Sequence, residues 1–201
     1  MQIDRLPLLL SASRLALGPC FAIFALRLGA EGFAGHADTA LRAGPLAIAL
    51  FAAASDFLDG RLARRLGVAT RRGAALDVAA DAAFLLCALA ALARVGVIPL
   101  VLPVAATVSL AAFARRWPVV ARDDTLASGL GDASVARPAH RAPADALGHA
   151  AGILNYAVVL AASAAPFLVF PRTLIGGAAI AVAILNLAPL LLRRFRARSP
   201  S

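Results

Sequence analysis

Six long apolar segments alternate with shorter polar segments along this chain. Their lengths approach the ~20 residues that an α-helix needs to cross a bilayer. Because a backbone in lipid must satisfy its own hydrogen bonds, the pattern predicts an all-α polytopic membrane bundle with six transmembrane helices. We expect residues 1–201 to form a single domain. The six segments are roughly Leu8–Leu28, Gly44–Leu58, Gly73–Val95, Ile98–Phe113, Ala146–Val169 and Leu174–Leu192.

Prolines mark possible kinks, and a signal peptide is an alternative for the first segment. Pro99 and Pro103 in the fourth segment and Pro189 in the sixth are candidate kink positions. Arg14 interrupts the apolar region that a signal peptide needs, and no small-residue cleavage site follows. We therefore expect the first segment to be retained as a helix.

The chain is strongly apolar and strongly basic. Hydrophobic residues make up 61% of it and its mean hydropathy is +0.82, whereas soluble domains are roughly 45–50% apolar. The net charge of +9 rests on arginine, since the chain has no lysine. Most arginines flank the apolar segments, which is typical of membrane orientation rather than of a nucleic-acid groove. We expect no nucleic-acid partner.

The arginines divide unequally between the two sides of the predicted bundle. Fifteen lie in the two tails and in the connections after the second and fourth segments, against four on the opposite side. Positive residues concentrate on the cytoplasmic side of a membrane. Both termini are therefore predicted to be cytoplasmic, and the expected location is multi-pass in the cell inner (cytoplasmic) membrane.

Four aspartates stand in one block that runs from the end of the second segment into the third. The block reads D-x-x-D-G-x-x-A-R-x8-G-x-x-x-D-x-x-x-D, and its carboxylates belong to Asp56, Asp59, Asp77 and Asp81. Each pair, three or four residues apart, shares one helix face. If the two helices pair antiparallel, all four carboxylates converge just inside the cytoplasmic membrane surface. An aspartate at the centre of a membrane helix costs about 2.5–3.5 kcal/mol, so the block predicts compensating cations.

The chemistry of the block indicates a divalent metal and a phosphate-bearing substrate. Carboxylate oxygens suit Mg²⁺ or Mn²⁺, and a pair of ions can clamp phosphate oxygens. Gly60 and Gly73 let a ligand approach the backbone, and Ala63 is small on the same segment. Arg64 offers a planar charged fork for a phosphate. We expect two ions held by the four aspartates.

The block resembles the signature of the CDP-alcohol phosphotransferase family, with every fixed position present over residues 56–81. The resemblance implies transfer of a substituted phosphate, commonly the phosphatidyl group of CDP-diacylglycerol, to an alcohol in phospholipid biosynthesis, with release of CMP. It also implies a homodimer in a lipid bilayer. Asp56, Asp59 and Asp77 are implied as metal ligands, and Asp81 as the general base that also touches metal. The residues implied in binding the CDP moiety are Gly60, Ala63, Arg64 and Gly73.

Two flanking segments match the family less closely. The family's opening N-x-x-T-x-x-R is represented by Leu8, Ser11 and Arg14. Its later G-K-x-x-T-x-x-Q is represented by GHAAGILN, where His149 replaces Lys and Asn155 replaces Gln. These departures concern recognition of the acceptor rather than the core chemistry.

Basic residues gather near the cytoplasmic ends of the fourth and fifth segments. A phosphorylated acceptor, glycerol 3-phosphate first, would use such charges. Membrane orientation and attraction to anionic headgroups are the competing explanation. Inositol, serine and choline stay open as acceptors. The candidate acceptor-binding residues are Arg115, Arg116, Arg137, Arg141 and His149.

Two other functions fit parts of the pattern. An intramembrane prenyltransferase also binds a Mg-diphosphate with aspartates, but more membrane helices and two separated motifs would be expected. A divalent-cation transporter would line its path with acidic residues, and the fifth and sixth segments are nearly bare of them. The single block with G-x-x-A-R inside it favours a CDP-linked donor.

Overall fold

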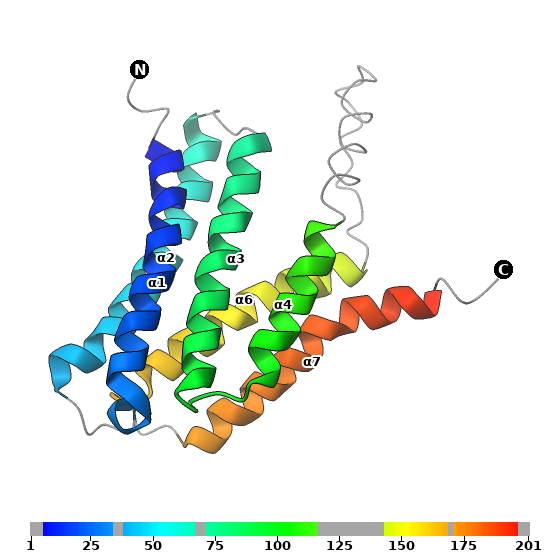
Figure 1. Cartoon of the computed structure of the whole chain (residues 1–201). Coiled ribbons are helices and arrows are strands. Elements are labelled where there is room, and N and C mark those ends of the chain that lie inside the picture. Colours follow the sequence, from blue (N-terminus) through cyan, green and yellow to red (C-terminus); the bar gives the residue numbers. More distant parts are fainter. Residues whose placement is uncertain (1–5, 34–37, 67–70, 116–142, 169–170, 197–201) are drawn as a thin grey trace, which may run out of the picture.

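The computed structural model describes residues 6–33, 38–66, 71–115, 143–168 and 171–196, and this part of the chain contains helices and no strand (Figure 1). Within these residues the prediction of an all-α fold is confirmed, and six helices are described. Each helix overlaps one of the six apolar segments. The helices are α1 (Leu6–Glu31), α2 (Thr39–Leu66), α3 (Arg71–Arg94), α4 (Val101–Ala114), α6 (Pro143–Ala164) and α7 (Arg172–Arg196).

The helices form two groups that pack against each other. Helices α1, α2 and α3 stand side by side in Figure 1, and α3 packs along much of α1. Helices α6 and α7 form the second group together with α4, which packs on α7. Because α6 also contacts α2 and α3, segments that are far apart in the sequence lie side by side.

Gly18 allows α1 and α3 to approach each other closely. A β-carbon at Gly18 would lie 3.2 Å from Cβ of Cys87 and 3.3 Å from Cα of Phe84, both on α3. Small residues permit such close packing between membrane helices. Gly18 shares a helix face with Arg14, one turn earlier. The close approach therefore sets Arg14 against α3.

Three aromatic rings join α1, α3 and α6. Phe21 and Phe84 pack edge to face with their centroids 6.1 Å apart, and Phe84 stacks on Tyr156 at 5.7 Å. The two phenylalanines are fully buried. Aromatic pairs of this geometry contribute about 0.5–1.5 kcal/mol beyond their burial. The rings fix the three helices relative to one another and hold the ring of Tyr156.

The prolines singled out in the sequence take different places. Pro99 precedes α4, and Pro103 lies in its first turn, where a backbone N–H has no intrahelical partner to lose. Pro189 lies inside α7. Gly29 in α1 has a non-helical backbone conformation, with φ at 62°. This conformation costs glycine little because glycine has no β-carbon.

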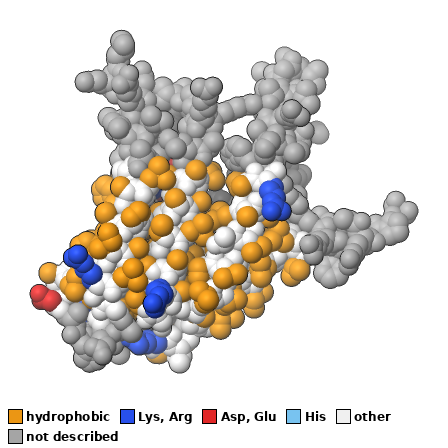
Figure 2. Space-filling view, in the orientation of Figure 1, with side chains coloured by type: hydrophobic (Ala, Val, Ile, Leu, Met, Phe, Trp, Pro, Cys, Tyr) orange, Lys and Arg blue, Asp and Glu red, His pale blue; other side chains and the backbone are white. Residues whose placement is uncertain are grey.

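Two of the described helices are long and apolar enough to cross a membrane. They comprise Thr39–Leu58 in α2 and Arg172–Leu192 in α7, and only 22% and 33% of their apolar windows is buried inside the protein. Val101–Ala114 and Ala150–Ala164 are shorter apolar helices. Figure 2 shows hydrophobic side chains spread over the visible face of the bundle. The six helices are thus confirmed, whereas the six-span topology with cytoplasmic termini stays a prediction.

Candidate active site

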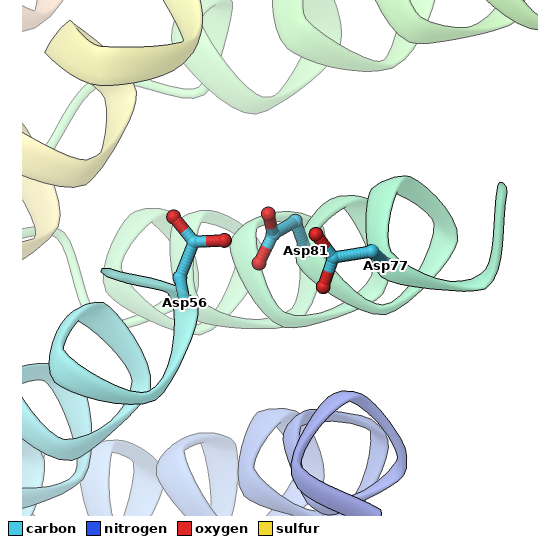
Figure 3. Close-up of side chains that lie close together, drawn as sticks. All are labelled: Asp56, Asp77 and Asp81. Carbon is cyan, nitrogen blue, oxygen red and sulfur yellow. The ribbon is translucent and has the colours of Figure 1, made fainter. Parts of the chain in front are cut away.

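Three aspartates from two helices turn their carboxylates toward one another (Figure 3). Asp56 lies on α2, and Asp77 and Asp81 lie one turn apart on the same face of α3. One oxygen of each carboxylate lies within 4.8 Å of those of the other two. The side chains of Asp56, Asp77 and Asp81 are 44%, 32% and 24% exposed, so a ligand can reach them from outside.

The other predicted residues of the block lie at the adjoining ends of the two helices. Asp59 follows Asp56 by three residues on α2, and its side chain lies outside the described part of the structure. The side chains of Ala63 and Arg64, which the resemblance places on the CDP moiety, also lie outside the described part. Gly60, Ala63 and Arg64 lie in the last two turns of α2, and Gly73 lies in the first turn of α3.

The candidate acceptor-binding residues lie on different segments. Arg115 follows the last residue of α4, and its side chain is exposed. The backbone of His149 lies in α6, while its side chain is outside the described part. Arg116, Arg137 and Arg141 also lie outside the described residues. Contact between these five residues and an acceptor stays a prediction.

Arg14 of α1 is fully buried and contacts all three carboxylates. Its Nη1 donates to Oδ1 of Asp56 at 2.8 Å and also to Oδ1 of Asp81, while its Nη2 donates to Oδ1 of Asp77. The planar guanidinium presents several donors in a fixed fork, which suits contacts in different directions. One guanidinium against three carboxylates leaves a formal charge of −2 for the four side chains.

Tyr156 of α6 contacts the same site. Its hydroxyl donates a 3.0 Å hydrogen bond to Oδ1 of Asp81. Oδ1 of Asp81 therefore accepts from both Tyr156 and Arg14. Within the described part of the chain, the hydrogen bonds to this carboxylate end on Oδ1, which leaves Oδ2 for a ligand. Helices α1, α2, α3 and α6 all contribute a side chain to the site.

A buried amide pair joins α6 to α7. The side-chain amides of Asn155 and Asn186 exchange two hydrogen bonds, of 3.2 Å and 3.1 Å. Asn186 also donates to the carbonyl oxygen of Val182 at 2.9 Å. Asn155 is the residue that stands where the resembling family segment has Gln. In this structure the side-chain amide of Asn155 is hydrogen-bonded to Asn186 of α7.

The donor set of the acidic cluster fits a hard divalent cation. Mg²⁺ and Mn²⁺ prefer carboxylate oxygens, and Asp56, Asp77 and Asp81 supply such oxygens from two helices at mutually short distances. The remaining charge of −2 on the cluster and Arg14 equals the charge that one such ion neutralises. These residues are therefore suited to hold a divalent metal.

Sequence reasoning missed the partners of Arg14 and Tyr156. Arg14 lies inside the first apolar segment, away from its ends, and an ionisable residue at such a position usually has an internal partner. That signal was available. Tyr156 is the single tyrosine of the chain, and no spacing connects it with a block 75 positions earlier. Its role became visible only in the folded structure.

Comparison with known proteins identifies the family. A family model described as CDP-alcohol phosphatidyltransferase matches residues 4–189. A comparison with curated proteins gives no match. The matched family consists of transferases that are generally embedded in membranes and use divalent metals. Because the match includes Arg14, the acidic cluster and Tyr156 and leaves out only the chain ends, this chain belongs to the CDP-alcohol phosphatidyltransferase family.

Proposed function

We propose that this enzyme transfers the phosphatidyl group of CDP-diacylglycerol to the hydroxyl group of an alcohol in phospholipid biosynthesis. The family supports transfer of a phosphatidyl group from a CDP-linked donor. The observation that carries the proposal is the convergence of Asp56, Asp77 and Asp81 between α2 and α3. A diphosphate donor needs charge neutralisation and positioning more than covalent chemistry, and this cluster suits both requirements.

The four aspartates of the block are proposed to hold Mg²⁺ or Mn²⁺, as a pair of ions. The mutual distances of Asp56, Asp77 and Asp81 support this assignment, and Asp59 follows on the same helix. When bound, such ions neutralise the charge of the diphosphate and stabilise the leaving phosphate. The protein's part is to hold the carboxylates in place on two packed helices.

Asp81 is proposed as the general base. Arg14 and Tyr156 hold Oδ1 of Asp81, so Oδ2 is oriented to accept the proton of the acceptor hydroxyl. The acceptor oxygen then forms a bond to the phosphorus that carries the diacylglycerol group. The bond from that phosphorus to the bridging oxygen breaks, and CMP leaves with the bridging oxygen.

The ends of α2 and α3 are proposed to bind the CDP moiety. Gly60, Ala63 and Arg64 lie between Asp56 and the end of α2, and Gly73 lies between the start of α3 and Asp77. A nucleotide held there would place its diphosphate next to the carboxylates. Arg64 is proposed to contact a phosphate through its bidentate fork.

The acceptor is proposed to be a phosphorylated polyol, with glycerol 3-phosphate favoured over inositol, serine and choline. The basic residues Arg115, Arg116, Arg137, Arg141 and His149 support this choice by their charge. We further propose a single-domain homodimer that crosses the inner membrane six times and presents the site to the cytoplasm, where a nucleotide leaving group is released. The outward-facing apolar surfaces of α2 and α7 support the membrane location.

The family match favours this function over the two alternatives considered from the sequence. A prenyltransferase or a cation transporter would also use aspartates and a divalent ion. Neither alternative accounts for a match to the CDP-alcohol phosphatidyltransferase family over residues 4–189.

CMP release tests the proposal. Detergent-purified protein receives CDP-diacylglycerol, Mg²⁺ or Mn²⁺, and one acceptor at a time from a panel that includes glycerol 3-phosphate, inositol, serine and choline. Acceptor-dependent CMP release is expected, with the highest rate for glycerol 3-phosphate. A highest rate with an unphosphorylated acceptor, whether inositol, serine or choline, would overturn the acceptor assignment. No release with any acceptor from folded protein would overturn the proposed reaction.

A further inference from the structure

We propose that Arg14 is the built-in counter-cation of the acidic site, which holds the carboxylates together without metal and competes with a divalent ion for them. The inference rests on the proposed metal site. It assigns to Arg14 a role in metal affinity that is separate from any contact with substrate.

The position of Arg14 supports the competition. Its two terminal nitrogens donate to oxygens of Asp56, Asp77 and Asp81, so the guanidinium lies among the carboxylates rather than beside one of them. The same three residues form the group that is close enough to hold one ion. A cation that binds all three therefore either displaces Arg14 from the Oδ1 atoms or takes the other carboxylate oxygens beside the positive guanidinium, and Arg14 opposes its binding in both cases.

The crowding of the carboxylates favours a counter-charge. The three carboxylates lie within 4.8 Å of one another and therefore repel, and the guanidinium that contacts them is itself 0% exposed. Arginine is suited to this place because it stays charged and is more weakly hydrated than lysine. Its anchoring on α1, which packs closely on α3 at Gly18, keeps it in reach of the cluster.

Metal affinity in the absence of substrate tests the inference. Mn²⁺ binding to chelator-treated wild-type protein is measured by titration calorimetry and compared with Arg14→Gln. The variant is expected to bind Mn²⁺ about tenfold more tightly or better, because hydrogen bonds between charged groups no longer have to be broken. Arg27→Gln is the matched control, since Arg27 lies exposed on the same helix and its loss removes the same charge. Its Mn²⁺ affinity is expected to stay within about twofold of wild type.

Thermal unfolding gives a second readout. Without metal, Arg14→Gln is expected to melt below wild type, because the carboxylates have lost their counter-charge. Saturating Mn²⁺ is expected to close most of this gap. Equal or weaker Mn²⁺ binding by Arg14→Gln, or a melting gap that Mn²⁺ leaves unchanged, would overturn the inference.

A second variant covers the case in which Arg14→Gln does not fold. Arg14→Lys keeps the charge but replaces the planar fork with a compact ammonium that cannot reach the three carboxylates in the same geometry, so it is expected to fold and to bind Mn²⁺ more tightly than wild type by a smaller factor. Unchanged or weaker binding by Arg14→Lys would then overturn the inference. CMP release by wild-type protein is measured separately, so failure of the Arg14 inference leaves the test of the proposed reaction intact.

Discussion

The hydroxyl of Tyr156 donates a 3.0 Å hydrogen bond to Oδ1 of Asp81 and so ties α6 to the acidic site. Arg14 donates to the same oxygen from α1. Donors from two helices therefore fix one oxygen of Asp81 and set the direction of the other. A group that takes a proton in a reaction has to be oriented as well as basic, because catalysis depends on a near-attack geometry. This arrangement supports the proposal that Asp81 acts as the general base.

Tyr156→Phe tests the orientation of Asp81. Phenylalanine keeps the stack on Phe84 but loses the hydroxyl, so the fold is expected to persist. We expect kcat to fall about tenfold, since one hydrogen bond to a charged group is lost, while the KM for the CDP-linked donor changes by less than about twofold. Steady-state CMP release gives both constants. If kcat equals that of wild type, Tyr156 serves packing alone.

Asp81→Asn tests the base itself. Asparagine keeps an oxygen that can accept from Tyr156 and Arg14, so the local contacts are expected to persist. We expect turnover to fall by about 10²–10⁴-fold, the range that a general base contributes. Asp38→Asn is the matched control because Asp38 is exposed near the start of α2, outside the acidic cluster. Wild-type turnover in folded Asp81→Asn protein would refute the assignment of Asp81 as base.

Local spacing predicted much of the site, and tertiary contacts accounted for what was missed. Long apolar segments predicted the six helices that the structure describes, because a backbone in lipid would have to satisfy its own hydrogen bonds. Helical periodicity placed Asp77 and Asp81 on one face, and the short connection to α2 brought Asp56 near them. The hydrogen bonds that Asp81 accepts from Arg14 and Tyr156 join residues 67 and 75 positions apart in the sequence. Helical periodicity relates only residues a few positions apart, so it could not predict these contacts. The close approach of α1 and α3 at Gly18 could not be predicted either, because it depends on which residues of α3 face Gly18 in the folded protein.

Removal of divalent metal tests the role of the acidic cluster. Treatment with a chelator is expected to abolish CMP release, and added Mg²⁺ or Mn²⁺ is expected to restore it, because the carboxylates alone repel an anionic diphosphate. Mn²⁺ at about 100 times its Kd should also stabilise the folded protein by about 2.7 kcal/mol, visible as a higher melting temperature. Chelator saturated with Mg²⁺ beforehand is the control. Full activity after complete chelation would show that the reaction proceeds without the proposed ions.

Gly18→Val tests the close approach of α1 and α3. The added carbons would crowd Cys87 and the backbone of Phe84, so overpacking of about 1–3 kcal/mol is expected. Turnover should fall as well, because separation of α1 from α3 moves Arg14 away from the carboxylates. Gly177→Val on α7 is the matched control, since a β-carbon at Gly177 meets nothing within 4 Å. Equal melting temperatures for the two variants would contradict tight packing at Gly18.

The paired amides of Asn155 and Asn186 predict a coupling between α6 and α7 that stabilises the fold without joining the chemistry. Each single change to Ala leaves one buried amide without its partner, so each should lower the free energy of unfolding by about 1–3 kcal/mol. The double variant loses both amides, so its free energy of unfolding is expected to fall by less than the sum of the losses in the two single variants. Hydrogen bonds between membrane helices average about 0.6 kcal/mol and reach about 1.7 kcal/mol in such cycles.

This coupling is measured by a double-mutant cycle of wild type, Asn155→Ala, Asn186→Ala and the double variant. Circular dichroism monitors the reversible unfolding of each of the four proteins in detergent. Because Asn155 occupies the place of a Gln in the resembling family segment, acceptor KM is measured in parallel. If acceptor KM rises for Asn155→Ala and not for Asn186→Ala, the result would indicate that Asn155 binds the acceptor rather than serving only to pack α6 against α7. Additive losses of stability would instead show that the two amides do not act as a pair.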